Sequence, residues 1–144
     1  MLIRLCQSNG ITPICTVRRE EQAEMLRTKF GVKNVVNLTK KEDYPRGMGM
    51  MCMKYKPSVC LECIAGEMTG QMLDFMGFAS TLILYGLLSD KPASGIDVIG
   101  FIGKGQTIES YVLNNMLSKM SMMEYGQFVL RVMPLYSSDL QTEV

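Results

Sequence analysis

Two adjacent arginines, Arg18 and Arg19, are the residues of this 144-residue sequence whose position most directly suggests chemistry. They stand between an apolar run at 14–17 and the glutamates Glu20 and Glu21. Glutamates suit the first turn of a helix, where the backbone carries partial positive charge, whereas arginines just before that turn do not. Because guanidinium groups bind phosphate through paired hydrogen bonds, the pair suggests a phosphate site. The alternative is that both arginines are solvated, or form weak surface ion pairs with the glutamates.

Other reactive side chains suggest weaker sites. Histidine is absent, which excludes a histidine general base and imidazole metal ligands supplied by this sequence. Cys60 and Cys63 have the spacing of redox dithiols and zinc knuckles, but a strand would point them to opposite faces and no second pair follows. We expect both to be buried as small hydrophobic residues. The methionine-rich stretches 47–53 and 116–125 favour packing over a copper or other cofactor site.

The composition is typical of a globular protein, with 47% hydrophobic and 20% charged residues. A net charge of +1 gives no indication of a nucleic-acid partner. No apolar stretch reaches the roughly 18 to 20 residues that a membrane span needs. Five irregularly spaced cysteines do not indicate a disulfide framework, so we expect an intracellular, reducing compartment, either cytoplasmic or mitochondrial.

Hydrophobic patterning predicts alternating strands and helices. The apolar runs predict strands at 11–17, 34–38, 58–64, 81–86 and 107–113. Helices are predicted at 1–10, 20–31, 41–55, 66–78 and 114–132, with a polar loop at 89–95. Ala23, Leu26 and Phe30 fall on one face of the second helix. Continuous apolar strands separated by helices predict an α/β fold, a doubly wound parallel sheet with helices on both faces.

This arrangement places Arg18 and Arg19 at the C-terminal end of a strand, where open parallel sheets bind ligands. In a dinucleotide-binding sheet, an acidic residue after the second strand binds the ribose hydroxyls of NAD, whereas an arginine accommodates the 2′-phosphate of NADP. The arginine pair therefore favours NADP. The sequence contains neither a G-x-G-x-x-G turn nor a P-loop.

The ordered segments 11–38, 58–66, 80–86 and 107–113 resemble the cofactor domain of the medium-chain dehydrogenase/reductase family. They look closest to its zinc-free quinone oxidoreductases and mitochondrial enoyl-thioester reductases. The resemblance implies a Rossmann-type fold, NADP as cofactor and no metal. It implies that Arg18 and Arg19 face the adenosine 2′-phosphate. The other cofactor contacts that it implies follow three later strands and are Cys63, Ile64, Tyr85, Gly86, Leu87, Leu88, Tyr111, Val112 and Leu113.

The sequence begins in what the resemblance identifies as the first helix of the nucleotide fold. The first strand, its glycine-rich turn and the family's catalytic domain are therefore expected to be missing. We expect residues 1–133 to form a partial NADP-binding Rossmann-like domain and 134–144 to be a C-terminal extension. The missing strand is central in the order 3-2-1-4-5-6. We therefore expect another chain, or a further part of the same polypeptide, to complete the sheet, unless the two flanking strands pair directly.

Two functions are compatible with these features. The first is the cofactor-binding part of an NADP(H)-dependent oxidoreductase that acts on a quinone, an enoyl thioester or another α,β-unsaturated carbonyl compound. Hydride transfer would then be chemistry of the cofactor, and we expect no catalytic residue within this chain. The alternative is a non-catalytic structural subunit of a larger assembly. For either function the resemblance implies a homodimer through residues 107–113.

Overall fold

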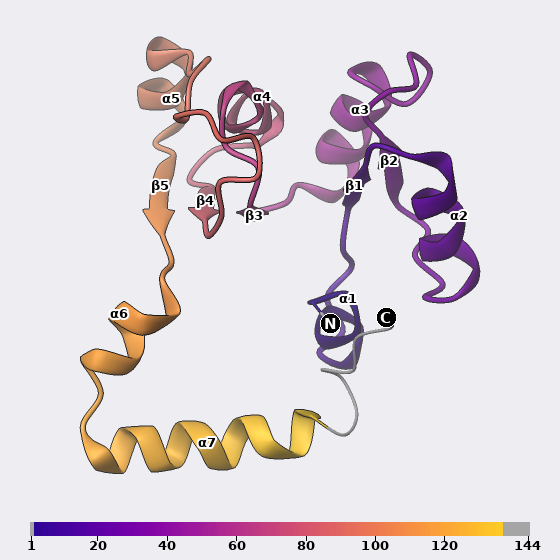
Figure 1. Cartoon of the computed structure of the whole chain (residues 1–144). Coiled ribbons are helices and arrows are strands. Elements are labelled where there is room, and N and C mark those ends of the chain that lie inside the picture. The colour runs from indigo at the N-terminus through magenta and orange to yellow at the C-terminus, as the bar shows by residue number, and fades with distance from the viewer. Residues whose placement is uncertain (1, 137–144) are drawn as a thin grey trace. The chain divides into compact units, whose positions relative to one another are not determined.

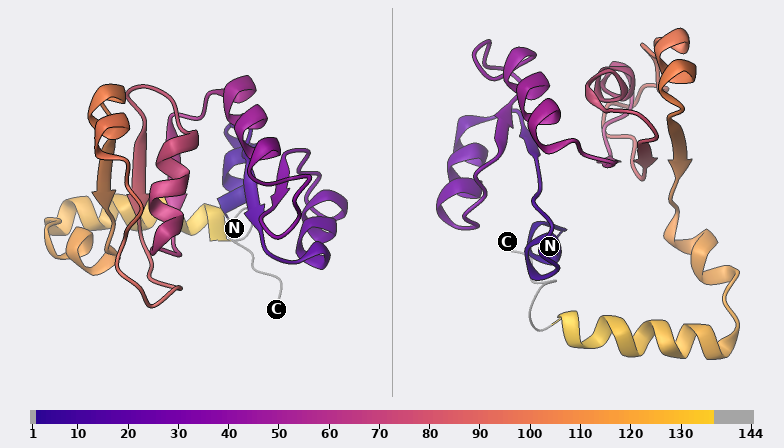
Figure 2. Two further views of the ribbon diagram at one scale, coloured as in Figure 1. Left: turned by 90° about the horizontal axis from the view of Figure 1, so that it is seen from above. Right: turned by 180° about the vertical axis from the view of Figure 1, so that it is seen from behind.

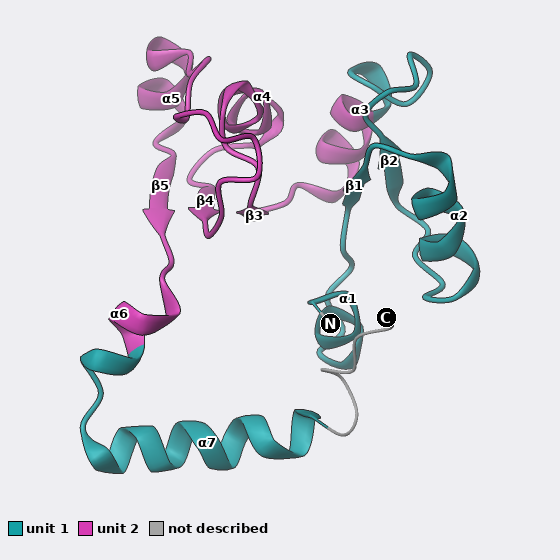
Figure 3. Ribbon diagram, in the orientation of Figure 1, with its two compact units in different colours: residues 1–47, 117–144 teal, residues 48–116 magenta. Residues whose placement is uncertain are grey.

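The computed structural model describes residues 2–136, in which strands and helices alternate (Figure 1). Contacts divide the chain into two compact units, residues 1–47 with 117–144, and residues 48–116 (Figure 3). Every strand pairing among residues 2–136 is parallel, so the predicted α/β class with a parallel sheet is confirmed. None of the helices in the described part of the chain is long and apolar enough to cross a membrane.

The first unit is built on a short parallel pair of strands. After helix α1 (Leu2–Ser8) come β1 (Cys15–Val17), α2 (Glu20–Thr28) and β2 (Val35–Asn37), and β1 pairs with β2. The buried core consists of Ala23, Leu26, Val32 and Val35, and Phe30 packs against it. The predicted apolar face of α2 is thus confirmed. Burial of this face attaches the helix, and with it the β1–α2 turn, to the strands.

The second unit contains a three-stranded parallel sheet in the order β3–β4–β5. Its elements are α3 (Arg46–Tyr55) from residue 48 on, β3 (Val59–Glu62), α4 (Glu67–Phe75), β4 (Thr81–Leu84), α5 (Val98–Lys104), β5 (Thr107–Ser110) and the start of α6 (Leu113–Ser118). Two further views show the strands running side by side and flanked by helices (Figure 2). The register aligns Glu62 with Leu84 and Leu84 with Ser110, so all three strands end at the same edge.

Several predicted element bounds differ from the observed ones. All strands are shorter than predicted, and α3 begins only after Pro45. The predicted helix at 114–132 is two helices, α6 and α7 (Met122–Tyr136), separated at 119–121. Within its own unit, β1 pairs with β2 and β3 pairs with β4, and direct pairing of the two strands that would flank the central one stays a prediction. The predicted extension 134–144 lies mostly outside the described residues, and the domain bounds remain predictions.

Helix α5 was not predicted, although its capping residues can be recognised in the sequence. The side chain of Asp97 accepts a hydrogen bond from the backbone N–H of Ile99 at 3.2 Å, which caps the N-terminus. Gly105, with φ of 60°, ends the helix in the left-handed conformation. Gly100 and Gly103 lower the helix propensity between these caps and hide the pattern.

Candidate functional site

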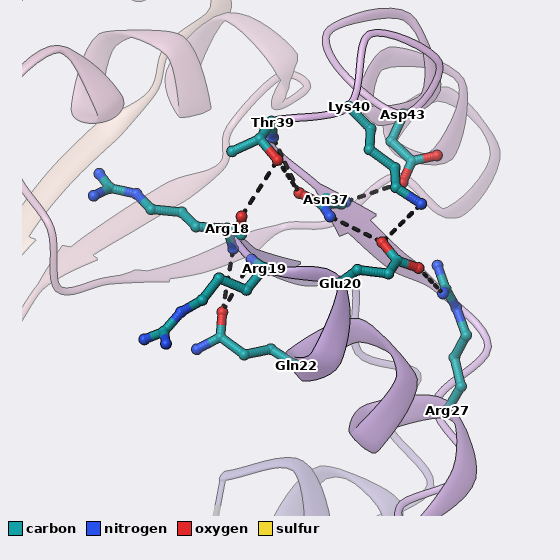
Figure 4. A network of polar contacts seen from close by, with 9 residues as sticks. All are labelled: Arg18, Arg19, Glu20, Gln22, Arg27, Asn37, Thr39, Lys40 and Asp43. Carbon is teal, nitrogen blue, oxygen red and sulfur yellow. Dashed lines mark hydrogen bonds and ion pairs between the residues drawn. The ribbon is translucent and has the colours of Figure 1, made fainter.

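Arg18 and Arg19 form the turn between β1 and α2, as the sequence predicts. Both side chains are exposed, and in Figure 4 they point away from Glu20. Within residues 2–136, neither guanidinium forms a salt bridge; the observed ion pairs of this region involve Glu20 with Arg27 and with Lys40. The turn therefore presents two positive charges to solvent at the C-terminal end of a parallel strand.

The backbone of this arginine turn is held from two directions. The side-chain oxygen of Gln22 accepts hydrogen bonds from the backbone N–H groups of Arg18, at 3.4 Å, and Arg19, at 3.2 Å. The hydroxyl of Thr39, which follows β2, donates to the backbone oxygen of Arg18 at 3.3 Å. Contacts from α2 and from the segment after β2 thus fix the point from which both long side chains extend.

The Glu20 side chain points away from the arginine turn and binds other residues (Figure 4). Its Oε2 accepts from Lys40 Nζ at 2.8 Å and from Asn37 Nδ2 at 2.9 Å, and its Oε1 accepts from an amino group of Arg27 at 3.1 Å. The hydrogen bond from Lys40, with further help from Asn37 and Arg27, lowers the pKa of Glu20 to about 2. Pairing of Arg18 and Arg19 with the neighbouring glutamates is therefore not observed among residues 2–136, whereas the exposure of both arginines agrees with the alternative that they are solvated.

The second unit collects the other predicted cofactor contacts at one sheet edge. Cys63, Tyr85 and Tyr111 are the residues that directly follow β3, β4 and β5, whose last residues are in register. The structure therefore brings together the three predicted turns, which are completed by Ile64, by Gly86, Leu87 and Leu88, and by Val112 and Leu113. Arg18 and Arg19 belong to the first unit instead.

Sequence reasoning missed the residue that holds the turn after β3. Glu62 is only 4% exposed, and one carboxylate oxygen accepts from the backbone N–H groups of Ile64 and Ala65. The other oxygen accepts from the hydroxyl of Thr69 at 2.9 Å. A single acidic residue inside the apolar run at 58–64 was the available signal, because a buried carboxylate must find donors.

The turns after β3 and β4 contact each other through their backbones. The N–H of Leu88 donates to the oxygen of Cys63 at 2.9 Å, and the N–H of Ser89 donates to the oxygen of Ile64 at 2.8 Å. Gly86 fits this approach because it has no side chain: a Cβ there would meet the Cys63 oxygen at 2.8 Å. These contacts fix the two predicted cofactor turns against each other.

Titratable groups near these turns favour their neutral forms. Burial, with a smaller contribution from a hydrogen bond with Cys63, raises the pKa of Tyr85 to about 12. Burial also raises the pKa of Cys60 to about 12. Cys60 and Cys63 are free thiols that are only partly buried, so the expectation of full burial is wrong. Among residues 2–136, no group of three or more metal-ligating side chains is assembled; that the protein uses no metal stays a prediction.

Comparison with known proteins identifies the chain's relatives. The family model described as zinc-binding dehydrogenase matches residues 1–131. No curated protein sequence matches significantly. A structure from Mesorhizobium loti assigned as an NADPH:quinone reductase is similar with a TM-score of 0.85 at 22% identity, over 99% of this chain and 41% of that one. The mitochondrial 2-enoyl thioester reductase heterodimer of Candida tropicalis gives a TM-score of 0.77 at 15% identity, over 98% and 40% of the two chains.

These structures establish the fold, and the chain spans about 40% of the length of the solved relatives that it matches. The predicted resemblance to quinone reductases and enoyl-thioester reductases is thereby confirmed over a segment the size of a cofactor domain. Because the family model matches residues 1–131 and the strands pair in parallel, the chain belongs to the zinc-binding dehydrogenase family.

Proposed function

We propose that this chain is the cofactor-binding part of an NADP(H)-dependent oxidoreductase that reduces a quinone or an enoyl thioester. Family membership and the fold favour this function over a non-catalytic structural subunit. The observation that carries the choice of cofactor is the arginine turn, where two exposed guanidiniums follow a parallel strand without an ion-pair partner among residues 2–136. Such a turn fits the dianionic 2′-phosphate that distinguishes NADP from NAD.

The turns of the second unit support a role in binding a nicotinamide ring. Leu87 and Leu88 are 56% and 78% exposed, and Tyr111 is 44% exposed. Exposed apolar and aromatic side chains at the C-terminal ends of parallel strands offer a surface for an aromatic ring. The cofactor would supply hydride transfer, and this chain's residues would orient the ring and exclude water. We assign no catalytic residue to the chain.

The substrate class follows from the relatives alone. One similar structure carries the name of an NADPH:quinone reductase, and one subunit of the yeast heterodimer is known in complex with NADP and crotonyl-CoA. We propose a quinone or an α,β-unsaturated thioester as substrate, zinc-independent chemistry, and a cytoplasmic or mitochondrial location. Each of these remains a proposal that activity assays with purified protein can test.

We propose two further partners from the sheet edges. In the first unit β1 pairs with β2 on one side, and in the second β3 pairs with β4 on one side. An additional strand, from another chain or a further part of the same polypeptide, would complete these edges. Strand β5 is the other edge of the β3–β4–β5 sheet. Residues 107–113 are therefore available for pairing with a second copy in a homodimer.

Cofactor titration tests the proposed function. The complete protein, with any completing chain present, would be titrated with NADPH and with NADH while nucleotide fluorescence is followed. We expect Arg18→Ala and Arg19→Ala each to weaken NADPH binding by about tenfold or more, because each removes a charge-assisted contact to phosphate. NADH affinity is expected to stay unchanged.

Arg131→Ala is the matched control, because it removes an exposed arginine of α7 far along the sequence from the arginine turn. It should leave both affinities unchanged. Absence of NADPH binding by the complete protein would overturn the proposed function. Equal weakening of NADPH and NADH by the two arginine substitutions would overturn the assignment of the phosphate site.

A further inference from the structure

We propose that Lys40 is a positioning residue that sets the preference for NADP over NAD, by holding the Glu20 carboxylate away from the arginine turn. This inference rests on the proposed function, because it concerns the same phosphate site. Lys40 follows β2, whereas Glu20 is the first residue of α2. Their contact therefore joins the segments that follow two neighbouring parallel strands.

The carboxylate of Glu20 is held by donors from three places (Figure 4). Lys40 Nζ lies 2.8 Å from Oε2, the closest of the three, and Asn37 Nδ2 lies 2.9 Å from the same atom. An amino group of Arg27, which lies about two helical turns further along α2, is 3.1 Å from Oε1. Asn37 is only 2% exposed, so its amide is a fixed anchor rather than a mobile surface group.

Glu20 directly follows the two residues that would bind the phosphate. An acidic side chain after the second strand is the group that selects the ribose hydroxyls of NAD. If the Glu20 carboxylate were released, it would repel a phosphate dianion. It would also attract the guanidiniums of Arg18 and Arg19, which would otherwise bind the phosphate. Its capture by Lys40 and Arg27 balances its charge locally and leaves Arg18 and Arg19 without this competing partner.

Lys40 carries more of this effect than the other two donors. It supplies a full positive charge at the shortest distance, and its hydrogen bond is the largest cause of the lowered pKa of Glu20. Asn37 is neutral and cannot balance a charge. The hydrogen bond from Arg27 is longer, at 3.1 Å, and is the smallest of the three hydrogen-bond contributions to the lowered pKa of Glu20. Loss of Lys40 would thus free the carboxylate more than loss of either neighbour.

The test measures the ratio of the NADH and NADPH dissociation constants in the complete protein. We expect Lys40→Met to weaken NADPH binding about three- to tenfold, because the Glu20 carboxylate would then carry an uncompensated negative charge near the phosphate. NADH binding should be unchanged or tighter. In the double variant Glu20→Gln with Lys40→Met, the NADPH affinity should return to within about twofold of wild type, because the repelling charge is gone. Lys41→Met, which removes the adjacent exposed lysine, is the matched control and should change neither affinity.

The outcomes separate this inference from the proposed function. If wild-type protein fails to bind NADPH, the proposed function falls. If wild type prefers NADPH but Lys40→Met keeps the same ratio, only the role of Lys40 falls. If the double variant stays as weak as Lys40→Met, then Lys40 contacts the phosphate directly and the positioning role is overturned. Thermal unfolding of every variant would show that each is folded, and Glu20→Gln alone should bind NADPH at least as tightly as wild type.

Discussion

A Cβ atom at Gly86 would lie 2.8 Å from the backbone oxygen of Cys63. The two residues follow neighbouring strands, β4 and β3, and their turns are tied by the hydrogen bond from Leu88 N–H to the Cys63 oxygen. Real Cβ atoms essentially never come within 3.0 Å of another heavy atom, so a larger residue at Gly86 would push the turns apart. The sheet edge with the predicted cofactor contacts therefore requires a residue without a side chain at position 86.

We expect Gly86→Ala to lower the free energy of unfolding by about 1 to 3 kcal/mol, the usual effect of inserting atoms into a packed region. Gly70→Ala should be worse, because a Cβ there would lie 2.0 Å from the backbone oxygen of Gly95. Gly103→Ala is the control: nothing lies within 4 Å, and the position is inside α5. That substitution should stabilise by about 0.5 to 1 kcal/mol. Urea unfolding measures all three, and equal effects would contradict the close approach.

The buried carboxylate of Glu62 should be required for the turn after β3. Thr69→Val removes the hydroxyl that donates to one carboxylate oxygen, so we expect a loss of about 1 to 3 kcal/mol in the free energy of unfolding. Glu62→Ala should lose at least as much, because it leaves the buried backbone N–H of Ala65 and the partly buried N–H of Ile64 without their acceptor.

Glu67→Ala is the comparison for these two variants, because Glu67 is an exposed carboxylate close to Glu62 in sequence. It should change the free energy of unfolding by less than about 1 kcal/mol, the usual contribution of an exposed acidic residue in the first turn of a helix. Chemical denaturation of the three variants checks the order. A loss with Glu67→Ala as large as with Thr69→Val would show that burial of Glu62 contributes nothing specific.

The contacts of Glu20 should make stability depend on acid pH. The pKa of Glu20 is lowered from 4.5 to about 2 in the folded protein, so the unfolded chain takes up its proton first as the pH falls. The stabilising contribution is therefore fully present above about pH 4.5 and is lost between that pH and about 2. Melting temperatures of wild type and Glu20→Gln, measured from pH 7 downward, should converge over this range. A constant difference across the range would contradict the assignment.

Tyr85 should ionise later than an ordinary tyrosine. Burial raises its pKa from 10.0 to about 12, since the phenolate would lose hydration beside Cys63. The folded state keeps the proton longer than the unfolded state, so this residue's contribution to stability declines as the pH rises above about 10. Alkaline titration followed by tyrosinate absorbance should show a late component that Tyr85→Phe removes. Tyr125→Phe, which removes a tyrosine of α7 in the other unit, should leave that component in place.

Local sequence patterns predicted most of the elements correctly. The apolar face of α2 could be read from spacing, because burial imposes a period of about 3.6 on a helix. The parallel strands could be read from continuous apolar runs, because helices cover both faces of such a sheet. Element ends were less accurate: β1 has three residues where seven were predicted. Helix α5 was missed because Gly100 and Gly103 weaken its propensity, although Asp97 and Gly105 cap it.

The candidate site divides in the same way. Arg18 and Arg19 could be placed at the end of a strand from neighbouring residues alone. The family resemblance implied Cys63, Tyr85 and Tyr111 as cofactor contacts, and the strand register shows that they follow strands that end at one edge. Glu62 could not be assigned a role, because its donors include Thr69, seven residues later and on a helix.

By itself, the sequence determined the α/β class and the position of two arginines before a helix, because both depend on residue types over short spans. Only the tertiary structure decided which charges remain available there. Glu20 stands next to Arg19 in the chain, yet it pairs with Lys40, which lies twenty residues further on and reaches it because β1 and β2 are parallel neighbours. Ion pairing follows distance in space, which sequence separation does not determine.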